Sequence, residues 1–322
     1  MEAAPETSPR AGLDLVRTVC PLCGSDEAEP AAVGNDSACQ VTGDSFLMLS
    51  CAACGLLYLD PRPAIEEQAR LYPRSYFEWS ERSHGAGRGV TRAVVRDALR
   101  RSASDPAPAR ILEVAYGAGL HLDLLRSFAP SGCVVEATTP HEPLAAPARS
   151  RGFTVHRSRA QELSANRGAY DLVFLLHSLE HVYSPVEEAE ALHELLRPGG
   201  RLIILTPNAE SRVSHIFRGR HWAAYDFPRH PCLFGPNTMR RLAAATGFEV
   251  ERLDSLSDSG VWADSTNALL SDWGAPPWLT RIASGGVLAI AGAAALIPLT
   301  HRREMNGPHL RAVLRKSVET RT

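Results

Sequence analysis

Lysine is nearly absent from this 322-residue chain, and neither a large net charge nor an internal repeat is present. Of its 34 basic residues only Lys316 is a lysine, which we attribute to nucleotide composition because Ala, Pro and Gly are abundant. The formal net charge of −2 excludes a global attraction to nucleic acid. The N-terminus is acidic and has no apolar core stretch, so we expect no signal peptide and a cytoplasmic location.

Cysteine is scarce as well, yet four of the seven cysteines form two C-x-x-C pairs. Two thiolates in one tight turn can bind a tetrahedral zinc ion, and the glycine after each pair permits that turn. The spacing predicts a structural zinc site, and disulfides are the alternative. The other three cysteines have no regular spacing, which suits a protein in a reducing compartment. The predicted ligands are Cys20, Cys23, Cys51 and Cys54.

One long apolar segment, residues 282–300, carries no charge across nineteen positions. That length approaches a membrane span. Ala, Gly and Ser make up more than half of the segment, however, so its insertion energy is marginal. We therefore expect a helix buried within the fold or in a homodimer interface, and membrane contact is the alternative.

The chain divides into five parts by composition and pattern. A tail rich in Ala, Pro and Glu comes first, followed by the cysteine-containing ribbon and a helical connector. A core of alternating strands and helices follows, and the chain ends in a helical insertion and a last strand. The predicted bounds are 1–17, 18–60, 61–108, 109–255 and 256–322.

Short apolar runs alternate with amphipathic segments through the core. This βαβ succession predicts an α/β fold with a doubly wound, Rossmann-like parallel sheet. The predicted helix at 237–246 has Asn237 as its N-cap, and Pro198-Gly199-Gly200 ends the helix before it. The predicted strands are 46–49 and 56–59 in the ribbon, then 111–114, 133–136, 153–155, 171–176, 202–205 and 248–253; the predicted helices are 90–99, 120–128, 143–150, 185–196 and 237–246.

Two acidic residues follow the first two core strands, where such folds bind nucleotides. The segment Glu113-Val-Ala-Tyr-Gly-Ala-Gly119 ends a strand and opens a helix, and its glycines let the backbone approach a ligand closely. Glu136 lies at the end of the next strand, where a carboxylate can accept both ribose hydroxyls. A glycine turn alone is a weak signal, and a turn without a ligand is the alternative.

A set of motifs in one order makes the signal specific. After the glycine turn come His177-Ser-Leu-Glu-His181, Leu196-Arg-Pro-Gly-Gly200, Thr206-Pro-Asn208 and Thr246-Gly-Phe248. Together they resemble class I S-adenosylmethionine-dependent methyltransferases, in the small-molecule branch with an N-terminal zinc ribbon that includes sugar C-methyltransferases. The resemblance covers about residues 18–255 and resumes near Leu310. It implies a seven-stranded sheet whose last strand, here 309–315, is antiparallel.

The resemblance also assigns the cofactor site. It implies that the glycine turn lies under the methionine part of S-adenosylmethionine, that Glu136 binds the ribose, and that the stretch from Arg159 forms the adenine edge. This chain has Ala115 where the family usually has the first glycine of the turn. It has Arg159 where the family often has an acidic residue beside the adenine. The implied cofactor-binding residues are Glu113, Ala115, Tyr116, Gly117, Gly119, Glu136, Ala137, Ala160, Gln161 and His177.

The histidine-rich motif after the fourth core strand is the candidate chemical centre. It also fits the H-x-x-E-H pattern of inverted zinc peptidases, but its first histidine ends a strand, which disfavours that alternative. Methyl transfer to a hydroxyl, amine or carbon acid needs a base, and a histidine suits this role. Arg229 is a candidate anion ligand for the acceptor, or else part of a surface salt bridge. The predicted catalytic residues are His177, Glu180, His181, His230 and Tyr76.

Several functions stay open. The first is methyl transfer to a small molecule, such as a biosynthetic intermediate or a sugar nucleotide. A nicotinamide-dependent oxidoreductase, or a non-methylating enzyme on the same fold, is the alternative. An RNA methyltransferase is disfavoured because no basic stripe flanks the ribbon. Residues 260–306, with Trp262, Trp273 and Trp278, are expected to form a helical excursion that packs on the core or on a second copy, its aromatic residues lining the acceptor pocket.

Overall fold

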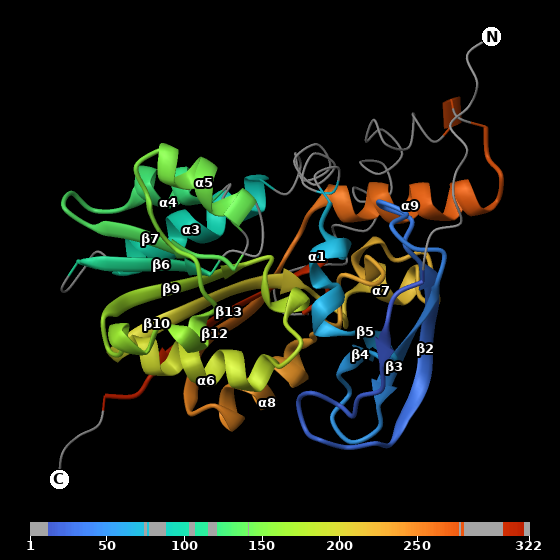
Figure 1. Ribbon diagram of the computed structural model, residues 1–322, viewed down its shortest axis with the longest axis horizontal. Helices are drawn as coiled ribbons and strands as arrows, with labels where there is room; N and C mark the ends of the chain where they lie inside the picture. Colours follow the sequence, from blue (N-terminus) through green and yellow to red (C-terminus); the bar gives the residue numbers. More distant parts are fainter. Residues whose placement is uncertain are drawn as a thin grey trace.

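The computed structural model describes residues 12–73, 76, 88–102, 107–114, 121–140, 142–276, 278–279 and 305–318. Within them, one mixed sheet forms the centre of the molecule and a smaller sheet lies beside it (Figure 1). Several sequence predictions lie outside the described residues: residues 1–11 of the tail, the glycine turn after Val114, the apolar segment 282–300 and most of the connector between Tyr76 and Arg88.

Seven described strands form the central sheet, in the order β12-β13-β10-β9-β6-β7-β8. The last strand, β13, pairs antiparallel with both β10 and β12, and the other pairings are parallel. The predicted α/β fold and its antiparallel final strand are therefore confirmed. The strands are β6 (Arg110–Val114), β7 (Val134–Thr138), β8 (Thr154–His156), β9 (Tyr170–Leu176), β10 (Leu196–Pro207), β12 (Phe248–Leu256) and β13 (His309–Lys316).

Helices cover both faces of this sheet because its central strands are apolar on both sides. In β9, Leu172 and Phe174 face a core formed with α3, α4 and α5, whereas Val173 and Leu175 face a core formed with α6 and α8. In Figure 1 these two helix groups lie above and below the sheet. Their bounds are α3 (Arg88–Ser102), α4 (Leu122–Phe128), α5 (Glu142–Ser150), α6 (Pro185–Leu195) and α8 (Pro236–Ala245).

Two predicted helix boundaries are wrong. The N-cap of α8 is Gly235, not Asn237, because Pro236 takes the first helical position, which needs no N–H donor. The Pro198-Gly199-Gly200 turn does not end α6 directly. Instead α6 ends at Leu195 and the turn forms an irregularity inside β10, where its pairing with β9 shifts register.

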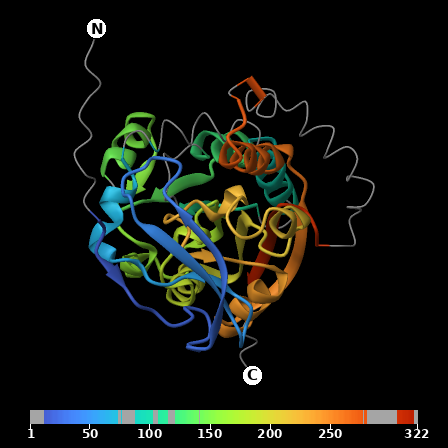
Figure 2. The same ribbon diagram turned by 90° about the vertical axis from the view of Figure 1, so that its right-hand side faces the viewer.

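The N-terminal sheet is a separate sheet that packs against the rest of the protein. It contains β2 (Ala28–Asn35), β3 (Ser45–Cys51), β4 (Leu57–Leu59) and β11 (Cys232–Leu233), and β11 pairs with β4 from far along the chain. The blue sheet faces the viewer in Figure 2. A shared apolar core joins it to the segment after β10, with Phe46 and Met48 on one side and Trp222 and Phe227 on the other.

This part of the chain shows two differences from the prediction. The strand β2 was not predicted, because Ala-Glu-Pro-Ala-Ala-Val-Gly-Asn lacks a clear apolar alternation. The tail was predicted to be disordered up to residue 17, yet β1 (Leu15–Val16) pairs with β5 (Arg62–Pro63), and Asp44 accepts a hydrogen bond from the Leu13 amide. Tertiary pairing orders residues whose composition alone favours a coil.

The predicted helical excursion begins as α9 (Ser259–Asp272), which packs against α7 and η5. Trp262 contacts Phe217 within the shared apolar core, while Trp273 and Trp278 are exposed. No helix in the described part of the chain is long and apolar enough to cross a membrane. The remaining short elements are η1 (Ile65–Glu67), α1 (Gln68–Leu71), η2 (Ala160–Glu162), η3 (Ser164–Asn166), η4 (Leu179–His181), α7 (Arg212–Ile216) and η5 (Ala223–Tyr225).

Candidate active site

The histidine-rich motif lies at the carboxyl end of β9, as predicted. His177 adopts a left-handed backbone conformation, with φ of 54°, and its amide donates to the carbonyl of Leu205 on β10. Non-glycine residues rarely adopt this conformation, and when they do it often marks a functional site. The turn sends Glu180 and His181, both in η4, back into the protein, whereas the His177 side chain stays 18% exposed.

Glu180 is a buried carboxylate that connects two strand ends. One oxygen accepts from the hydroxyl of Thr206 at 2.9 Å, and the other lies 3.4 Å from Nδ1 of His177. Burial alone would raise its pKa, but the hydrogen bond and the charge of His177 outweigh that effect and lower the pKa to about 2. Glu180 is therefore ionised at neutral pH.

His181 and His230 lie face to edge beneath this carboxylate. Their ring centroids are 4.6 Å apart. Nδ1 of His181 donates to the carbonyl of Arg229 at 3.0 Å, and the hydroxyl of Tyr72 lies 3.1 Å from the same nitrogen. Burial lowers the pKa of His181 to about 4, so this imidazole is neutral. Nδ1 of His230 donates to the carbonyl of Ala224 at 2.7 Å.

Tyr76 closes one side of the cluster. Its hydroxyl lies 3.4 Å from Asp226, and its ring lies under the guanidinium of Arg229, 4.8 Å from the ring centroid. Burial raises the pKa of Tyr76 well above its ordinary value. The buried phenol therefore keeps its hydrogen at neutral pH and donates it to Asp226.

Arg229 does not face an acceptor. Its side chain is fully buried and binds both oxygens of Asp36, at 2.8 and 3.1 Å, and Nε donates to the carbonyl of Leu71. The predicted anion-binding role and the surface salt bridge are both wrong. The reason is that β2 and the following loop cover this face and bring Asp36 to the arginine.

At the cofactor end, Glu113 is one of the described residues with a buried polar atom that has no hydrogen-bond partner. One of its oxygens accepts from Nδ1 of His121 at 3.0 Å. The other, Oε2, is buried and has no hydrogen-bond partner among the residues described. Such an orphaned carboxylate oxygen fits a cationic or hydroxylic ligand. The adjacent predicted residues Ala115, Tyr116, Gly117 and Gly119 lie outside the described part of the chain.

Glu136 has a different environment from the one expected. Its carboxylate accepts from Arg110 at 2.8 Å, His156 at 3.0 Å and Tyr170 at 2.6 Å. Burial would raise its pKa, but the hydrogen bonds from Tyr170, His156 and Arg110 together lower it. The register of β6 and β7 aligns Glu136 with Leu112 and aligns Glu113 with Ala137, so the two acids face opposite sides of the sheet.

The other predicted cofactor residues lie at the same edge of the sheet or near it. Ala137 is buried in the core with α5, and Ala160 in the core with α6. The exposed Gln161 donates to Glu188 of α6 at 2.7 Å. Burial raises the pKa of Glu188 to about 6.

Sequence reasoning missed a second acid–histidine pair beside His177. Nε2 of His309, on β13, lies 3.0 Å from Asp258, and the ring of His309 lies 5.2 Å from that of His177. Asp36 and Asp226 were missed too. Asp226 could have been found, because it lies three residues before the candidate Arg229 and four before His230. His309 reaches His177 through the pairing of β13, Asp258 is the N-cap of α9, and Asp36 lies in the loop after β2, so their meeting with the site depends on the tertiary structure.

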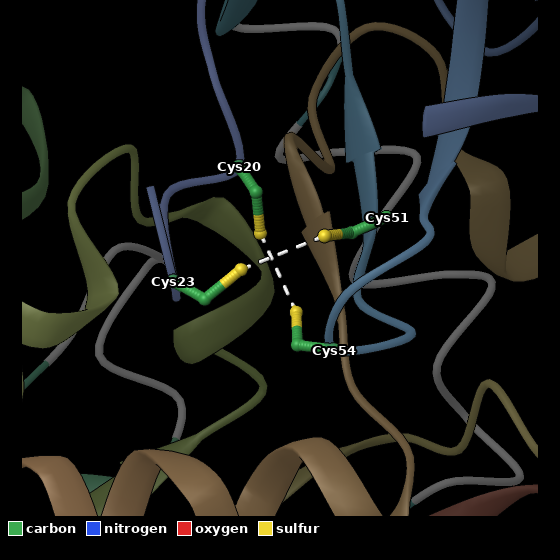
Figure 3. Close-up of side chains that lie close together, drawn as sticks. All are labelled: Cys20, Cys23, Cys51 and Cys54. Atoms are coloured by element: carbon green, nitrogen blue, oxygen red, sulfur yellow. Dashed lines mark hydrogen bonds between the residues drawn. The ribbon is translucent and has the colours of Figure 1, made fainter. Parts of the chain in front are cut away.

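The four predicted zinc ligands meet at the base of the N-terminal sheet. Figure 3 shows their sulfur atoms pointing toward one common centre. The Sγ atoms of Cys20 and Cys54 are 3.5 Å apart, as are those of Cys23 and Cys51. A tetrahedral zinc with bonds of about 2.3 Å places its sulfurs about 3.8 Å apart, so the set fits this ion. Gly24 and Gly55 have φ of 74° and 82°, as such turns require.

Comparison with known proteins points to one family. Residues 86–253, slightly more than half of the chain, match the model of a family described as methyltransferase domain. A ubiquinone biosynthesis O-methyltransferase of Aromatoleum aromaticum is 27% identical over 161 residues, which are 46% of this chain and 67% of that protein. One from Xanthomonas axonopodis pv. citri is 36% identical over 111 residues, 32% of this chain and 45% of that protein. The chain therefore spans 67% of the first relative's length and less than half, 45%, of the second's.

Solved structures show the same fold. The plantazolicin methyltransferase BamL, in complex with a triazolic desmethylPZN analog and SAH, superimposes with a TM-score of 0.50 at 13% identity, covering 78% of this chain and 93% of that one. The CurJ carbon methyltransferase gives a TM-score of 0.50 at 14% identity, covering 77% of this chain and 60% of that one. At this identity the likeness concerns the fold alone.

Proposed function

The chain belongs to the methyltransferase-domain family, and from that membership we propose that it transfers the methyl group of S-adenosylmethionine to a small-molecule acceptor. A biosynthetic intermediate, such as a sugar nucleotide, is the proposed acceptor class. The observation that carries the proposal is the position of Glu113 and His177 at the carboxyl ends of the adjacent strands β6 and β9. Open α/β sheets bind ligands at this edge.

His177 is the proposed base. The bound cofactor would supply an electrophilic methyl group, and the chain must hold the acceptor in line with it and accept its proton. Nδ1 of His177 lies 3.4 Å from the ionised Glu180, which favours the tautomer with the hydrogen on Nδ1 and the lone pair on Nε2. His181 and His230 are less suited, because both are over nine-tenths buried and both are held by backbone carbonyls.

Glu113 is the proposed ligand for the ammonium group of the cofactor, since its free oxygen is already desolvated. Glu136 stays the proposed ribose ligand. The ribose hydroxyls would then compete with Arg110, His156 and Tyr170 for its oxygens. We propose a structural zinc at the four cysteines, because a closed four-sulfur set leaves no open position for chemistry. The cytoplasm is the proposed location.

Calorimetric titration with S-adenosylmethionine tests this function, followed by detection of S-adenosylhomocysteine with candidate acceptors. We expect saturable binding of one cofactor per chain and acceptor-dependent turnover. Binding without turnover on any acceptor would favour a non-methylating enzyme. No binding, together with saturable binding of a nicotinamide cofactor, would favour the oxidoreductase.

A further inference from the structure

A second group of side chains of the types that bind metal ions lies in the core, far in sequence from the cysteines. Glu180, His181 and His230 each offer a ligand atom, and these atoms lie within 4.8 Å of one another. All three residues are over nine-tenths buried. Two atoms bound to one cation at about 2.0–2.1 Å lie at most about 4.2 Å apart, so small side-chain shifts would bring the three into one coordination shell.

The two histidines are already held in the tautomer that a metal ligand needs. A carbonyl oxygen can only accept, so Nδ1 of His181 and Nδ1 of His230 both carry hydrogen. Each ring therefore keeps its lone pair on Nε2. Metal-bound histidines characteristically donate their other nitrogen to a carbonyl or carboxylate in this way. The second oxygen of Glu180 is fixed similarly by the hydroxyl of Thr206.

The charges of the cluster are unbalanced without a cation. Arg229 is positive and pairs with Asp36 at 2.8 Å. A carboxylate oxygen of Asp226 lies farther from the same guanidinium, at 3.6 Å. Counting these three with Glu180, and taking the histidines as neutral, the charges sum to −2. Buried carboxylates are normally paired with cations or bound to metal ions. A divalent cation between Glu180, His181 and His230 would neutralise this charge.

We infer that Glu180, His181 and His230 form a binding site for a divalent transition-metal cation, separate from the four-cysteine site. Two imidazoles and one carboxylate suit Zn²⁺, Fe²⁺, Mn²⁺ or Co²⁺ better than Mg²⁺ or Ca²⁺, which prefer oxygen ligands. A further carboxylate, that of Asp226, lies 3.9 Å from Nε2 of His230. His177, the first histidine of the H-x-x-E-H motif, is not part of this set, so the arrangement differs from that of an inverted zinc peptidase.

This site does not rest on the proposed function, because cation binding is measurable without cofactor or acceptor. Where methyl transfer also holds, the cation would lie beside the proposed base, since Glu180 contacts both. Failure of methyl transfer would leave the binding site intact, and failure of cation binding would leave His177 as the base.

The test is a titration of untagged, zinc-loaded protein with Co²⁺ that is monitored by calorimetry and by visible absorption. We expect one bound cobalt per chain in addition to one zinc, without a thiolate-to-cobalt charge-transfer band. His230→Gln and His181→Gln should each weaken cobalt binding at least about tenfold. His215→Gln, at an exposed histidine of α7, is the matched control and should bind as the wild type does.

Three results would overturn the inference. The first is no cobalt binding beyond the zinc site, in which case a proton on a histidine balances the charge. The second is equal binding by His230→Gln and the wild type. The third is a charge-transfer band showing that cobalt has entered the cysteines. Should the histidine variants fail to fold, X-ray absorption of cobalt bound to the wild type decides, since two imidazole ligands and no sulfur are expected.

Discussion

Arg229 and Asp36 form a doubly hydrogen-bonded ion pair across 193 positions of the chain, and neither side chain is exposed to solvent. Asp36 also accepts from the amides of Cys39 and Val41. Burial would raise its pKa, but the hydrogen bond and charge of Arg229 lower it below its ordinary value. The pair thus joins the loop after β2 to the segment that carries His230 and Asp226.

We expect Asp36→Ala to lower the free energy of unfolding by roughly 3–5 kcal/mol, because it leaves an arginine buried without its partner. Urea unfolding measures this change. Arg167→Ala is the control: Arg167 and Glu194 also form a close pair, at 2.9 Å, but both side chains are more than half exposed. That variant should lose less than about 1 kcal/mol. A loss this small for Asp36→Ala would mean that the buried pair does not hold the two segments together.

Cys51→Ser should abolish zinc binding and destabilise the N-terminal sheet, because Cys51 ends β3 and lies in the apolar core shared with the central sheet. Elemental analysis of the wild type should show one zinc at the cysteines. Cys133→Ser, at a cysteine outside the cluster, should keep both zinc and stability. A zinc-free wild type of full stability would refute the structural role of the ion.

Glu113→Gln should weaken S-adenosylmethionine binding by about 1.5–3 kcal/mol, the range for a hydrogen bond to a charged group. This corresponds to at least roughly a tenfold rise in Kd, measured by calorimetry. Glu190→Gln, at an exposed site on α6, is the control and should leave Kd unchanged. An unchanged Kd for Glu113→Gln would show that its free oxygen does not contact the cofactor.

His177→Asn tests the proposed base without disturbing the backbone, since Asn tolerates the left-handed conformation that His177 adopts. We expect kcat to fall roughly 10²- to 10⁴-fold, the usual contribution of general base catalysis. The Kd for S-adenosylmethionine should change far less. His215→Gln should retain full activity. A kcat within about threefold of the wild type would remove His177 from the base role.

Ionisation of the buried Glu188 should lower the free energy of unfolding as the pH rises. Burial raises its pKa to about 6 from an ordinary value of 4.5. The protonated form is therefore favoured in the folded state, and its contribution is full below pH 4.5 and lost as the pH passes 6. The shift corresponds to about 2 kcal/mol.

Glu188→Gln keeps the oxygen that accepts from Gln161 and cannot ionise. We expect it to be more stable than the wild type at pH 7.5 by up to about 2 kcal/mol and nearly equal to it at pH 4.5. Urea unfolding at both pH values provides the comparison, with Glu190→Gln as the exposed control. The same stability difference at both pH values would contradict the raised pKa.

Local sequence determined much of this protein. The C-x-x-C spacing predicted four sulfurs that do converge, because the ligands of each pair lie in one tight turn. Apolar runs predicted the strands of the central sheet, since a strand buried on both faces must be apolar along its length. The run from His309 to Arg315 was correctly predicted as the antiparallel final strand.

The tertiary structure decided which polar groups meet. Asp36 reaches Arg229, and His309 reaches His177, only because strands far apart in the chain pair or pack together. Glu136 was predicted at the end of a strand, whereas it lies in the middle of β7, and the side to which its carboxylate points follows from the register of β6 and β7. A shift of one residue reverses the face of every side chain in a strand, and no local pattern around a single acidic residue specifies that register.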